Sequence, residues 1–385
     1  MAKGKKVLVT GACGFVGGQL IDLLLEKGYK VRGTDLPNAP RKHVEETGIE
    51  FIPADFTKSE TLPVVVKDVD MIFNIASVFN YYTPWEAMEK INVQGVKNLC
   101  DAVVKHNPDI EIFVHCSTGE VYGYNMFGKT TELTPEGEFL ESGSKTPGEA
   151  PYAKTKWLQE QEVWRYHKEK KLPVTAIRLG TVYGKGLFFS RLINLFADVA
   201  SLGVFPKNLN FRWPLVYVKD VAGAALFLAE TKDRAIGRAF NVADDQNYIL
   251  SDMVYAIADY LHMELNDLPI PPMSTVWKAV PKGAIVTEIV KAAYLTMTDE
   301  IKKKGEKVWF DYNHAVPYIE LILGGVKEWA DDFKYSNRSL KELGWKPQCS
   351  SFMDALPEMM EWSKKEGILV ENPGLKHLAT KALLF

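Results

Sequence analysis

A glycine-rich turn between an apolar run and an amphipathic run constrains the fold of this 385-residue chain more than any other feature. The apolar stretch "KKVLVTG" ends at Gly11, and "FVGGQLIDLLLEKG" follows with three leucines on one helical face and Gly28 at its end. The first pattern predicts a buried strand, and the second predicts a helix that stops at Gly28. A strand, a tight turn and a helix at the start of a chain predict the first half of a βαβ unit.

The same alternation continues along the first half of the chain. Strands are predicted in "YKVRGTD", "IEFIPAD", "DMIFNIAS", "IEIFVHCST" and "LPVTAIRLG", and helices in "WEAMEKINVQGVKNLCDAVVKH" and "YAKTKWLQEQEVWRYHKEKK". Later, "VYVKDVAGAALFLAE" and "RAFNVAD" predict a helix and a strand that return to the sheet. Strands that alternate with helices form right-handed βαβ units, so we predict an α/β fold with a doubly wound parallel sheet of the Rossmann type and a smaller, mostly helical C-terminal domain.

Composition excludes several classes of function. The net charge of −3 gives no general electrostatic reason to bind nucleic acid. The four cysteines have no CxxC spacing, which argues against a metal site and suits a reducing, cytoplasmic location. There is no stretch of 18 uncharged apolar residues, and glycines interrupt the short N-terminal apolar run. We therefore expect neither a transmembrane helix nor a signal peptide.

Gly11, Gly14 and Gly17 form a GxxGxxG motif directly after the first predicted strand. In this position one glycine permits a tight turn, one lets the backbone approach a pyrophosphate, and one lets the helix pack closely on the strand. The N–H groups and the positive dipole end of the helix then face the phosphates. The motif predicts a dinucleotide site within a domain of residues 1–185, to which residues 216–245 return.

Two aspartates follow the next predicted strands. Asp35 comes close to the usual offset of ~20 residues at which a carboxylate binds the adenosine ribose hydroxyls, which favours NAD. Arg32, Arg41 and Lys42 lie nearby and could accept the additional phosphate of NADP instead. Asp55, in "PADF", could reach the adenine amine, and it could equally cap the helix that follows.

The stretch "APYAKTKW" places Tyr152 four residues before Lys156, so that both side chains lie on one helical face. By itself this spacing fits an acid–base pair and an ordinary helix start equally well. A tyrosine with a pKa near ~10 needs a shift of about three units, or roughly 4 kcal/mol, to act near neutrality. An ammonium ~4 Å away at an effective dielectric near 20 supplies about that much.

Eight segments in order resemble the extended short-chain dehydrogenase/reductase superfamily. They are "TGACGFVGG", "AD" at 54–55, "INVQGVKNL", "STGEVYG", "YAKTK", "RLGTVYG", "VYVKDVA" and "LGWKP". The resemblance covers residues 5–250 well and 331–365 moderately, and it fails across 262–330. It implies that Tyr152 is the acid/base, that Lys156 is its partner and holds the nicotinamide ribose, and that the Thr118 hydroxyl holds the substrate oxygen. It also implies cofactor contacts at Phe15, Val16, Phe56, Ala76, Asn92 and Leu179.

The substrate is expected to be a small molecule bound by residues 186–215 and 246–385, with 262–330 as an insertion or apolar lid. Thr181 stands where many nucleotide-sugar enzymes of the superfamily carry Asn, and the layout is similar to 3β-hydroxysteroid and sterol-4-carboxylate 3-dehydrogenases. We therefore expect an NAD(H)-dependent oxidoreductase that interconverts a secondary alcohol and a ketone on a bulky, largely apolar substrate. The alternatives are a nucleotide-sugar epimerase with tightly bound NAD, for which Arg212 could clamp a phosphate, and a non-catalytic sensor of redox state.

Several polar residues near the predicted site have simpler interpretations. His115 lies in the middle of a predicted strand and is expected in the core. Glu120 matches the acid of sugar-nucleotide dehydratases, but those enzymes pair it with a preceding Asp, and this chain has Gly119. Dehydration is accordingly disfavoured.

Family resemblance and the apolar stripes of helices near 92–106 and 152–170 predict a homodimer. Trp157 and Trp164 are expected to pack against a helix or a second subunit. The terminal "KHLATKALLF" leaves a peripheral membrane contact open.

Overall fold

The computed structural model describes residues 4–79, 83–122, 151–186, 199–207, 212–246, 248–269, 335–349 and 351–367, together with residues 193, 196, 197 and 369. It confirms the α/β class, because seven strands form one sheet in which every neighbouring pair is parallel. The strands are β1 (Lys6–Thr10), β2 (Lys30–Thr34), β3 (Glu50–Phe51), β4 (Met71–Asn74), β5 (Ile112–Thr118), β6 (Val174–Leu179) and β11 (Ala239–Val242).

The strand order is β11-β6-β5-β4-β1-β2-β3. From β1 the chain builds β2 and β3 on one side and then returns to add β4 and the later strands on the other. The order therefore reverses between β1 and β4, and ligands of such sheets bind at the carboxyl ends of the strands beside this point. The register aligns Thr10 of β1 with Asn74 of β4, and Asn74 with His115 of β5.

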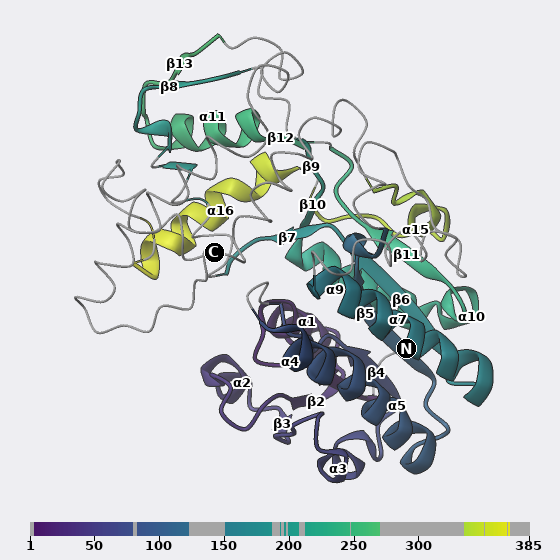
Figure 1. The fold of residues 1–385 in the computed structure, drawn as a ribbon. Helices are drawn as coiled ribbons and strands as arrows, with labels where there is room; N and C mark the ends of the chain where they lie inside the picture. The colour runs from purple at the N-terminus through teal and green to yellow at the C-terminus, as the bar shows by residue number, and fades with distance from the viewer. Residues whose placement is uncertain are drawn as a thin grey trace.

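Helices cover both faces of the sheet (Figure 1). One face carries α1 (Phe15–Glu26), α2 (Lys42–Thr47), α9 (Val218–Glu230), α10 (Lys232–Ala235) and α15 (Arg338–Glu342). The other carries η1 (Ser59–Thr61), α3 (Pro63–Val66), α4 (Trp85–Glu89), η2 (Lys90–Gln94), α5 (Gly95–His106) and α7 (Pro151–Lys170). Alternating residues of β1 face opposite ways: Val7 and Val9 join the core under α1 and α9, whereas Leu8 joins the core under α3, α5 and α7.

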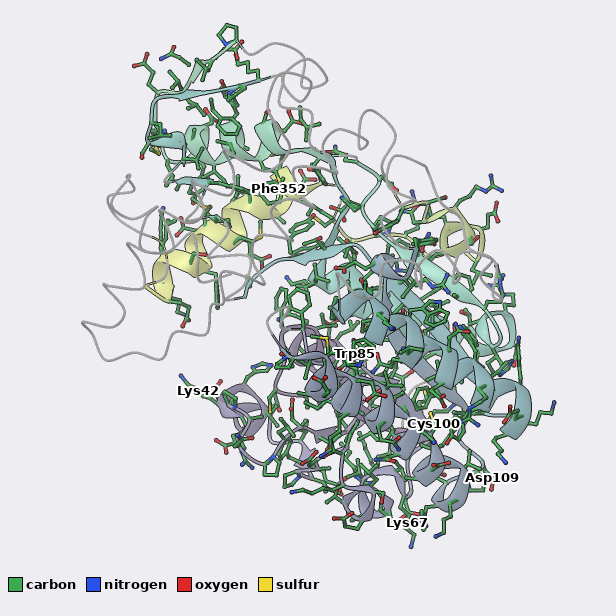
Figure 2. The ribbon with its side chains drawn as sticks, in the orientation of Figure 1. Lys42, Lys67, Trp85, Cys100, Asp109 and Phe352 are labelled. Carbon is green, nitrogen blue, oxygen red and sulfur yellow. The ribbon has the colours of Figure 1, made fainter. Side chains whose placement is uncertain are left out.

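A third core lies beyond the carboxyl end of the sheet. It joins β7 (Thr181–Tyr183) and β10 (Leu215–Tyr217) to α11 (Leu250–Tyr260) and α16 (Phe352–Lys365). Short pairs of β9 (Arg212–Trp213) with β12 (Tyr248–Ile249) and of β8 (Val204–Phe205) with β13 (Asn266–Asp267) accompany it. Figure 2 shows Phe352 in this part, apart from Cys100 among the helices of the sheet. The predicted lid at 262–330 lies outside the described residues except for 262–269.

The long helix predicted from Trp85 to His106 differs in one respect. The structure divides it into α4, the π-helical turn η2 and α5. Asn92 lies in this turn, fully buried, with its side chain bonded to the backbone of Val78 on a neighbouring loop. A π turn adds one residue to a helical turn, and such turns occur often at functional sites.

Candidate active site

A chain of buried, hydrogen-bonded side chains crosses β1 and β4, which flank the reversal point, and reaches β5. The Thr10 hydroxyl donates to Asn74 Oδ1 (3.0 Å) and accepts the backbone N–H groups of Ile75 and Ala76, both at 3.0 Å. Asn74 Nδ2 donates to His115 Nδ1 at 3.1 Å. Burial lowers the pKa of His115 to about 3, so the ring is neutral. His115 is thus a core residue, as expected, and Ala76 lies beside the glycine turn with its N–H group already bonded.

The glycine motif has the geometry that a phosphate-binding turn needs. Gly11 has a φ of +67°, and a Cβ there would lie 3.0 Å from the backbone nitrogen of Ala76. A Cβ on Gly17 would lie 2.1 Å from the carbonyl oxygen of Gly11, so glycine allows α1 to pack on the turn. Gly14 precedes α1 without a side-chain cap, and the first turn of α1 carries no acidic residue. The start of α1 therefore suits a bound anion.

Phe15 and Val16 begin α1 and pack against the third core. A Cβ on Gly186 would lie 2.7 Å from the Phe15 ring, which places the "VYGKG" loop directly on the glycine turn. These two side chains thereby connect the predicted pyrophosphate site to the substrate side of the molecule.

Asp35 lies at the end of β2, where its carboxylate already organises the turn. Oδ2 accepts the backbone N–H of Cys13 at 3.0 Å, and Oδ1 accepts that of Leu36 at 2.8 Å. A carboxylate offers about four lone-pair positions, so acceptor capacity remains for a ribose hydroxyl.

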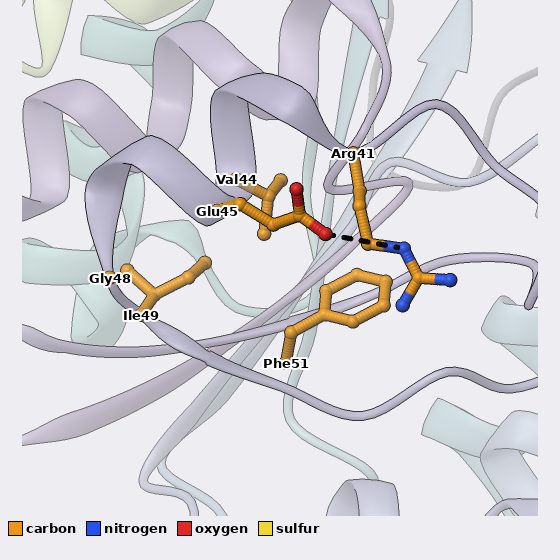
Figure 3. Close-up of a pocket in the computed structure, with 6 residues that line it drawn as sticks. All are labelled: Arg41, Val44, Glu45, Gly48, Ile49 and Phe51. Atoms are coloured by element: carbon orange, nitrogen blue, oxygen red, sulfur yellow. Dashed lines mark ion pairs between the residues drawn. The ribbon is translucent and has the colours of Figure 1, made fainter.

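The three cations that might favour NADP differ in their surroundings. Arg32 is buried, and its guanidinium is bonded to Glu50 and to three backbone carbonyls at the end of α3, so it is already engaged inside the fold. Arg41 lies over the Phe51 ring and 3.9 Å from Glu45, where a hollow of about 290 Å³ opens beside α2 (Figure 3). The exposed Lys42 points into solvent (Figure 2). An acidic neighbour at Arg41 opposes a phosphate there.

Asp55 and Phe56 follow β3. Thr57 donates both its backbone N–H and its hydroxyl to Asp55 Oδ1, at 3.0 and 2.7 Å. Burial alone would raise the pKa of Asp55, but these hydrogen bonds outweigh it and lower the pKa below its ordinary value. The Phe56 carbonyl accepts from Asn98 at 2.8 Å. Asp55 thus closes a turn two residues before η1 and does not cap that helix, which has no side-chain cap, while an adenine contact stays a prediction.

Asn92 and Leu179, two of the predicted cofactor contacts, are both buried. Besides holding Val78, the Asn92 amide donates to Thr155 Oγ1 at 3.2 Å, and Thr155 in turn donates to the Tyr152 carbonyl. Leu179 ends β6 and belongs to the core under α1 and α9. Asn92 therefore fixes the helix that carries Tyr152 against the loop after β4.

Lys156 joins α7 to the carboxyl end of the sheet. Its ammonium is buried and donates to the Cys116 carbonyl (2.7 Å), Ser77 Oγ (3.0 Å) and Gln159 Oε1 (2.5 Å). Burial lowers the pKa of Lys156 to about 8. All three partners are neutral groups.

Tyr152 and Thr118 lie on the two elements that Lys156 joins, α7 and β5. Tyr152 is one helical turn before Lys156 and meets the Phe79 ring edge-on, with 5.2 Å between the ring centres. Thr118 ends β5 two residues after Cys116, and its hydroxyl accepts the Glu120 N–H at 3.3 Å. Helix α7 runs antiparallel to β5, so its first turn lies at the carboxyl end of that strand. The structure thus gathers the three predicted residues in one region.

Sequence reasoning missed several residues that support Lys156. Glu160 is four residues after Lys156 but faces β6, where the buried Arg178 binds it and Ser117 (2.5 Å) and Trp164 (2.9 Å) donate to it. Burial opposes the charge of Glu160, but Arg178 and these hydrogen bonds outweigh that and hold its pKa well below the usual range. The signal was present: positions 159 and 160 share the Lys156 face of the helix and are polar.

The space beside Gly119 is occupied by a side chain that is distant in the sequence. A Cβ on Gly119 would lie 2.1 Å from the ring of Tyr335, which is buried and stacks on Tyr122 with 5.5 Å between ring centres. No aspartate side chain fits at this position while Tyr335 occupies it. This gives a physical reason for the absence of the dehydratase Asp–Glu pair.

The helices expected to form a dimer use their apolar residues inside the chain. Val96, Leu99 and Val103 of α5 pack with Val163 and Trp164 of α7 in one core. Their stripes consequently give no support to a dimer. Within the described part of the chain, no helix is long and apolar enough to cross a membrane.

Comparison with known proteins places the chain in a broad enzyme group. Residues 7–243 match the model of the NAD dependent epimerase/dehydratase family. Over 277 residues the chain is 28% identical to YtcB of Bacillus subtilis (strain 168), described as an uncharacterized UDP-glucose epimerase, covering 66% of this chain and 81% of that protein. The sterol-4-alpha-carboxylate 3-dehydrogenase (decarboxylating) of Bos taurus is 25% identical over 63% of this chain and 66% of its own. The structure of Bordetella bronchiseptica WbmF with NAD+ has a TM-score of 0.63 at 19% identity, covering 97% of each chain.

Proposed function

The chain belongs to the NAD-dependent epimerase/dehydratase family, and on that premise we propose that it is an NAD(H)-dependent oxidoreductase interconverting a secondary alcohol and a ketone. NAD is the cofactor of this family. When bound, it supplies the hydride acceptor or donor. The residues fit it: the start of α1 has no side-chain cap, Gly11 and Gly17 leave a cradle that a Cβ would fill, and Asp35 has acceptor positions left.

The observation that carries the proposal is the buried ammonium of Lys156, which donates to three neutral acceptors one helical turn from Tyr152. A buried positive charge stabilises a phenolate nearby, so that Tyr152 can take the proton of an alcohol and return it to a ketone. Thr118, at the end of β5, would hold the substrate oxygen. The chain's own residues thereby supply proton transfer and orientation.

A bulky, largely apolar substrate is supported by the surroundings of Tyr152. The Phe79 ring, edge-on to the Tyr152 phenol ring, is 49% exposed and offers an apolar surface beside the acid/base. Thr181 occurs where many nucleotide-sugar enzymes carry Asn, and one similar protein is a sterol-4-carboxylate dehydrogenase. Ligand pockets combine such apolar walls with a few fixed polar groups.

A nucleotide-sugar epimerase is the second candidate, favoured by the similarity to YtcB. Both candidates use Tyr152 and Lys156, so these residues do not separate them. An epimerase returns the hydride to the same substrate and retains its NAD, whereas a dehydrogenase releases NADH. Dehydration is disfavoured because Tyr335 fills the space beside Gly119.

The test combines cofactor exchange with a substrate screen. Native mass spectrometry of the purified protein measures whether NAD co-purifies and whether added NAD exchanges. NADH fluorescence then reports turnover with sterols, hydroxy-lipids and UDP-sugars. Freely exchanging NAD and NADH formation with an apolar alcohol support the proposal. Non-exchanging NAD with conversion of UDP-sugars alone would replace it by the epimerase.

We also propose that the enzyme is a homodimer, on family resemblance, and that it is cytoplasmic, because its four cysteines have no CxxC spacing. Sedimentation at micromolar concentration distinguishes a dimer from a monomer of 43.3 kDa. A single species at the monomer mass would contradict this part without affecting the catalytic proposal.

A further inference from the structure

The immediate partners of Lys156 differ from those that its sequence spacing predicts. A carboxylate four residues after a lysine on a helix is close enough to form an ion pair with it. Here Glu160 has that spacing, yet Arg178, Ser117 and Trp164 engage both of its oxygens. The neutral Gln159 takes the place beside the ammonium instead, with Oε1 2.5 Å from Nζ.

Ser77 completes this arrangement from another element. Its hydroxyl lies 3.0 Å from Lys156 Nζ and donates to Gln159 Oε1 at 3.1 Å. An ammonium has three donors, and Ser77, Gln159 and the Cys116 carbonyl accept all three. Ser77 and Gln159 are also bonded to each other, so the pair keeps a hydrogen bond when the ammonium turns toward another acceptor.

We propose that Gln159 is a positioning residue for the proposed reaction: with Ser77, it holds the Lys156 ammonium through neutral acceptors, so that no carboxylate bonded to Nζ reduces the effect of its charge on Tyr152. This inference rests on the proposed function. Gln159 is 2% exposed, and its side-chain carbonyl is fixed by two partners. A carboxylate at this position would neutralise the ammonium, and an apolar side chain would leave one of its donors without an acceptor.

The other charged and titratable groups around Lys156 do not change their charge in the pH range of the experiment. They are Glu160 on its own helix, His115 and Cys116 on β5, and Arg178 on β6. Burial holds the His115 ring neutral above about pH 3, and it raises the pKa of the Cys116 thiol. Glu160 stays ionised in its pair with Arg178. Between pH 5 and 9 we therefore assign a change in the pH dependence of activity to Lys156 and Tyr152.

Two substitutions of Gln159 should shift the pH dependence of activity in opposite directions. Gln159→Glu adds a carboxylate beside the ammonium, which weakens its effect on Tyr152. The rising limb of alcohol oxidation with pH should then move up by about one unit or more. Gln159→Leu removes an acceptor from a buried cation, so Lys156 loses its proton more easily. The alkaline limb of activity should then begin at least one pH unit lower than in the wild type.

The experiment measures kcat/KM against pH for both variants, with Gln94→Glu as the matched control. Gln94 is exposed on the neighbouring turn η2, so this control adds the same charge away from the cluster. A difference titration of tyrosinate absorbance between each protein and its Tyr152→Phe form follows the phenol without substrate. A residue with a merely structural role would lower turnover equally at every pH. Unchanged limbs in both Gln159 variants overturn the proposal.

Ser77→Ala provides a second variant if a Gln159 variant does not fold. It introduces no charge, and it should shift the alkaline limb in the same direction as Gln159→Leu by a smaller amount. An unchanged limb in folded Ser77→Ala also overturns the proposal. If instead Tyr152→Phe keeps most of the wild-type turnover, it is the proposed function that fails.

Discussion

Two buried charges in this protein, Lys156 and Asp244, are held by neutral partners in different regions. Lys156 lies between α7 and β5 and donates to a carbonyl, a hydroxyl and an amide. Asp244 follows β11 and accepts the hydroxyls of Tyr183 (2.8 Å) and Tyr248 (3.1 Å) and the N–H of Tyr217. Burial disfavours either charge, so it lowers the pKa of Lys156 to about 8 and raises that of Asp244 to about 7.

The difference between the two lies in what surrounds them. The partners of Lys156 meet where Tyr152 and the end of β5 lie, so its charge is directed at the proposed ligand site. The partners of Asp244 come from the third core, and the Tyr248 hydroxyl also accepts the first N–H of α16, that of Phe352, at 2.5 Å. Asp244 thereby joins the sheet to α16. The same physical arrangement thus serves chemistry in one region and assembly of the fold in the other.

Replacing Tyr152 by Phe tests the chemical side of this comparison and has the largest expected effect. The loss of general acid–base catalysis should lower turnover by about 10²–10⁴-fold, while NAD binding changes little, because the phenol transfers a proton and does not hold the cofactor. Enzyme kinetics measure the turnover, and titration with NAD measures the cofactor binding. Tyr166→Phe on the same helix is the control, since its hydroxyl bonds Asp101 away from the site. Wild-type rates in Tyr152→Phe would refute the catalytic assignment.

The buried ion pair of Glu160 and Arg178 tests the opposite case, in which a buried charge has a charged partner. Glu160→Gln keeps the shape of the side chain but leaves the fully buried Arg178 without its counter-charge. Such a change should lower the free energy of unfolding by about 3–5 kcal/mol. Urea unfolding measures it, and Glu162→Gln, which breaks a half-exposed pair with Arg165, should cost less than about 1 kcal/mol. Equal effects of the two changes would show that Arg178 reaches solvent.

Asp244 should give the protein a stability that depends on pH. Its folded pKa is raised, so its contribution is fully present below about pH 4, declines as the pH rises toward 7 and is lost above that value. The total change is on the order of 4 kcal/mol. Between pH 4 and 8 the free energy of unfolding should therefore depend less on pH in Asp244→Asn than in the wild type. Denaturant unfolding at several pH values measures it. Parallel pH dependences would mean that Asp244 is as well solvated in the folded state as in the unfolded chain.

The parts of this structure that local patterns encode could be predicted, and long-range side-chain contacts could not. Apolar periodicity and the glycine turn predicted β1, α1 and a parallel sheet, because these signals arise within a few residues. Helical spacing brought Tyr152 and Lys156 together, but the same spacing would pair Lys156 with Glu160, and tertiary contact with Arg178 overrides it. Tyr335 reaches Gly119 from another part of the chain, and no spacing rule indicates such a contact.

The smallest expected effect concerns Asp35, a partly exposed carboxylate that backbone N–H groups hold. Its remaining lone pairs should accept ribose hydroxyls and repel a 2′-phosphate, so the wild type should prefer NAD over NADP. Asp35→Ala should narrow that preference by roughly 10–100-fold, or about 1.5–3 kcal/mol, because a charged acceptor is lost. Asp35→Asn separates the two roles: its amide oxygen can still accept the Cys13 N–H and keep the turn, while the negative charge is gone. Isothermal titration of both dinucleotides against the three proteins gives the comparison. If the wild type binds NADP more tightly, Arg41 outweighs Asp35 despite its acidic neighbour Glu45, and the preference for NAD assigned to Asp35 is wrong.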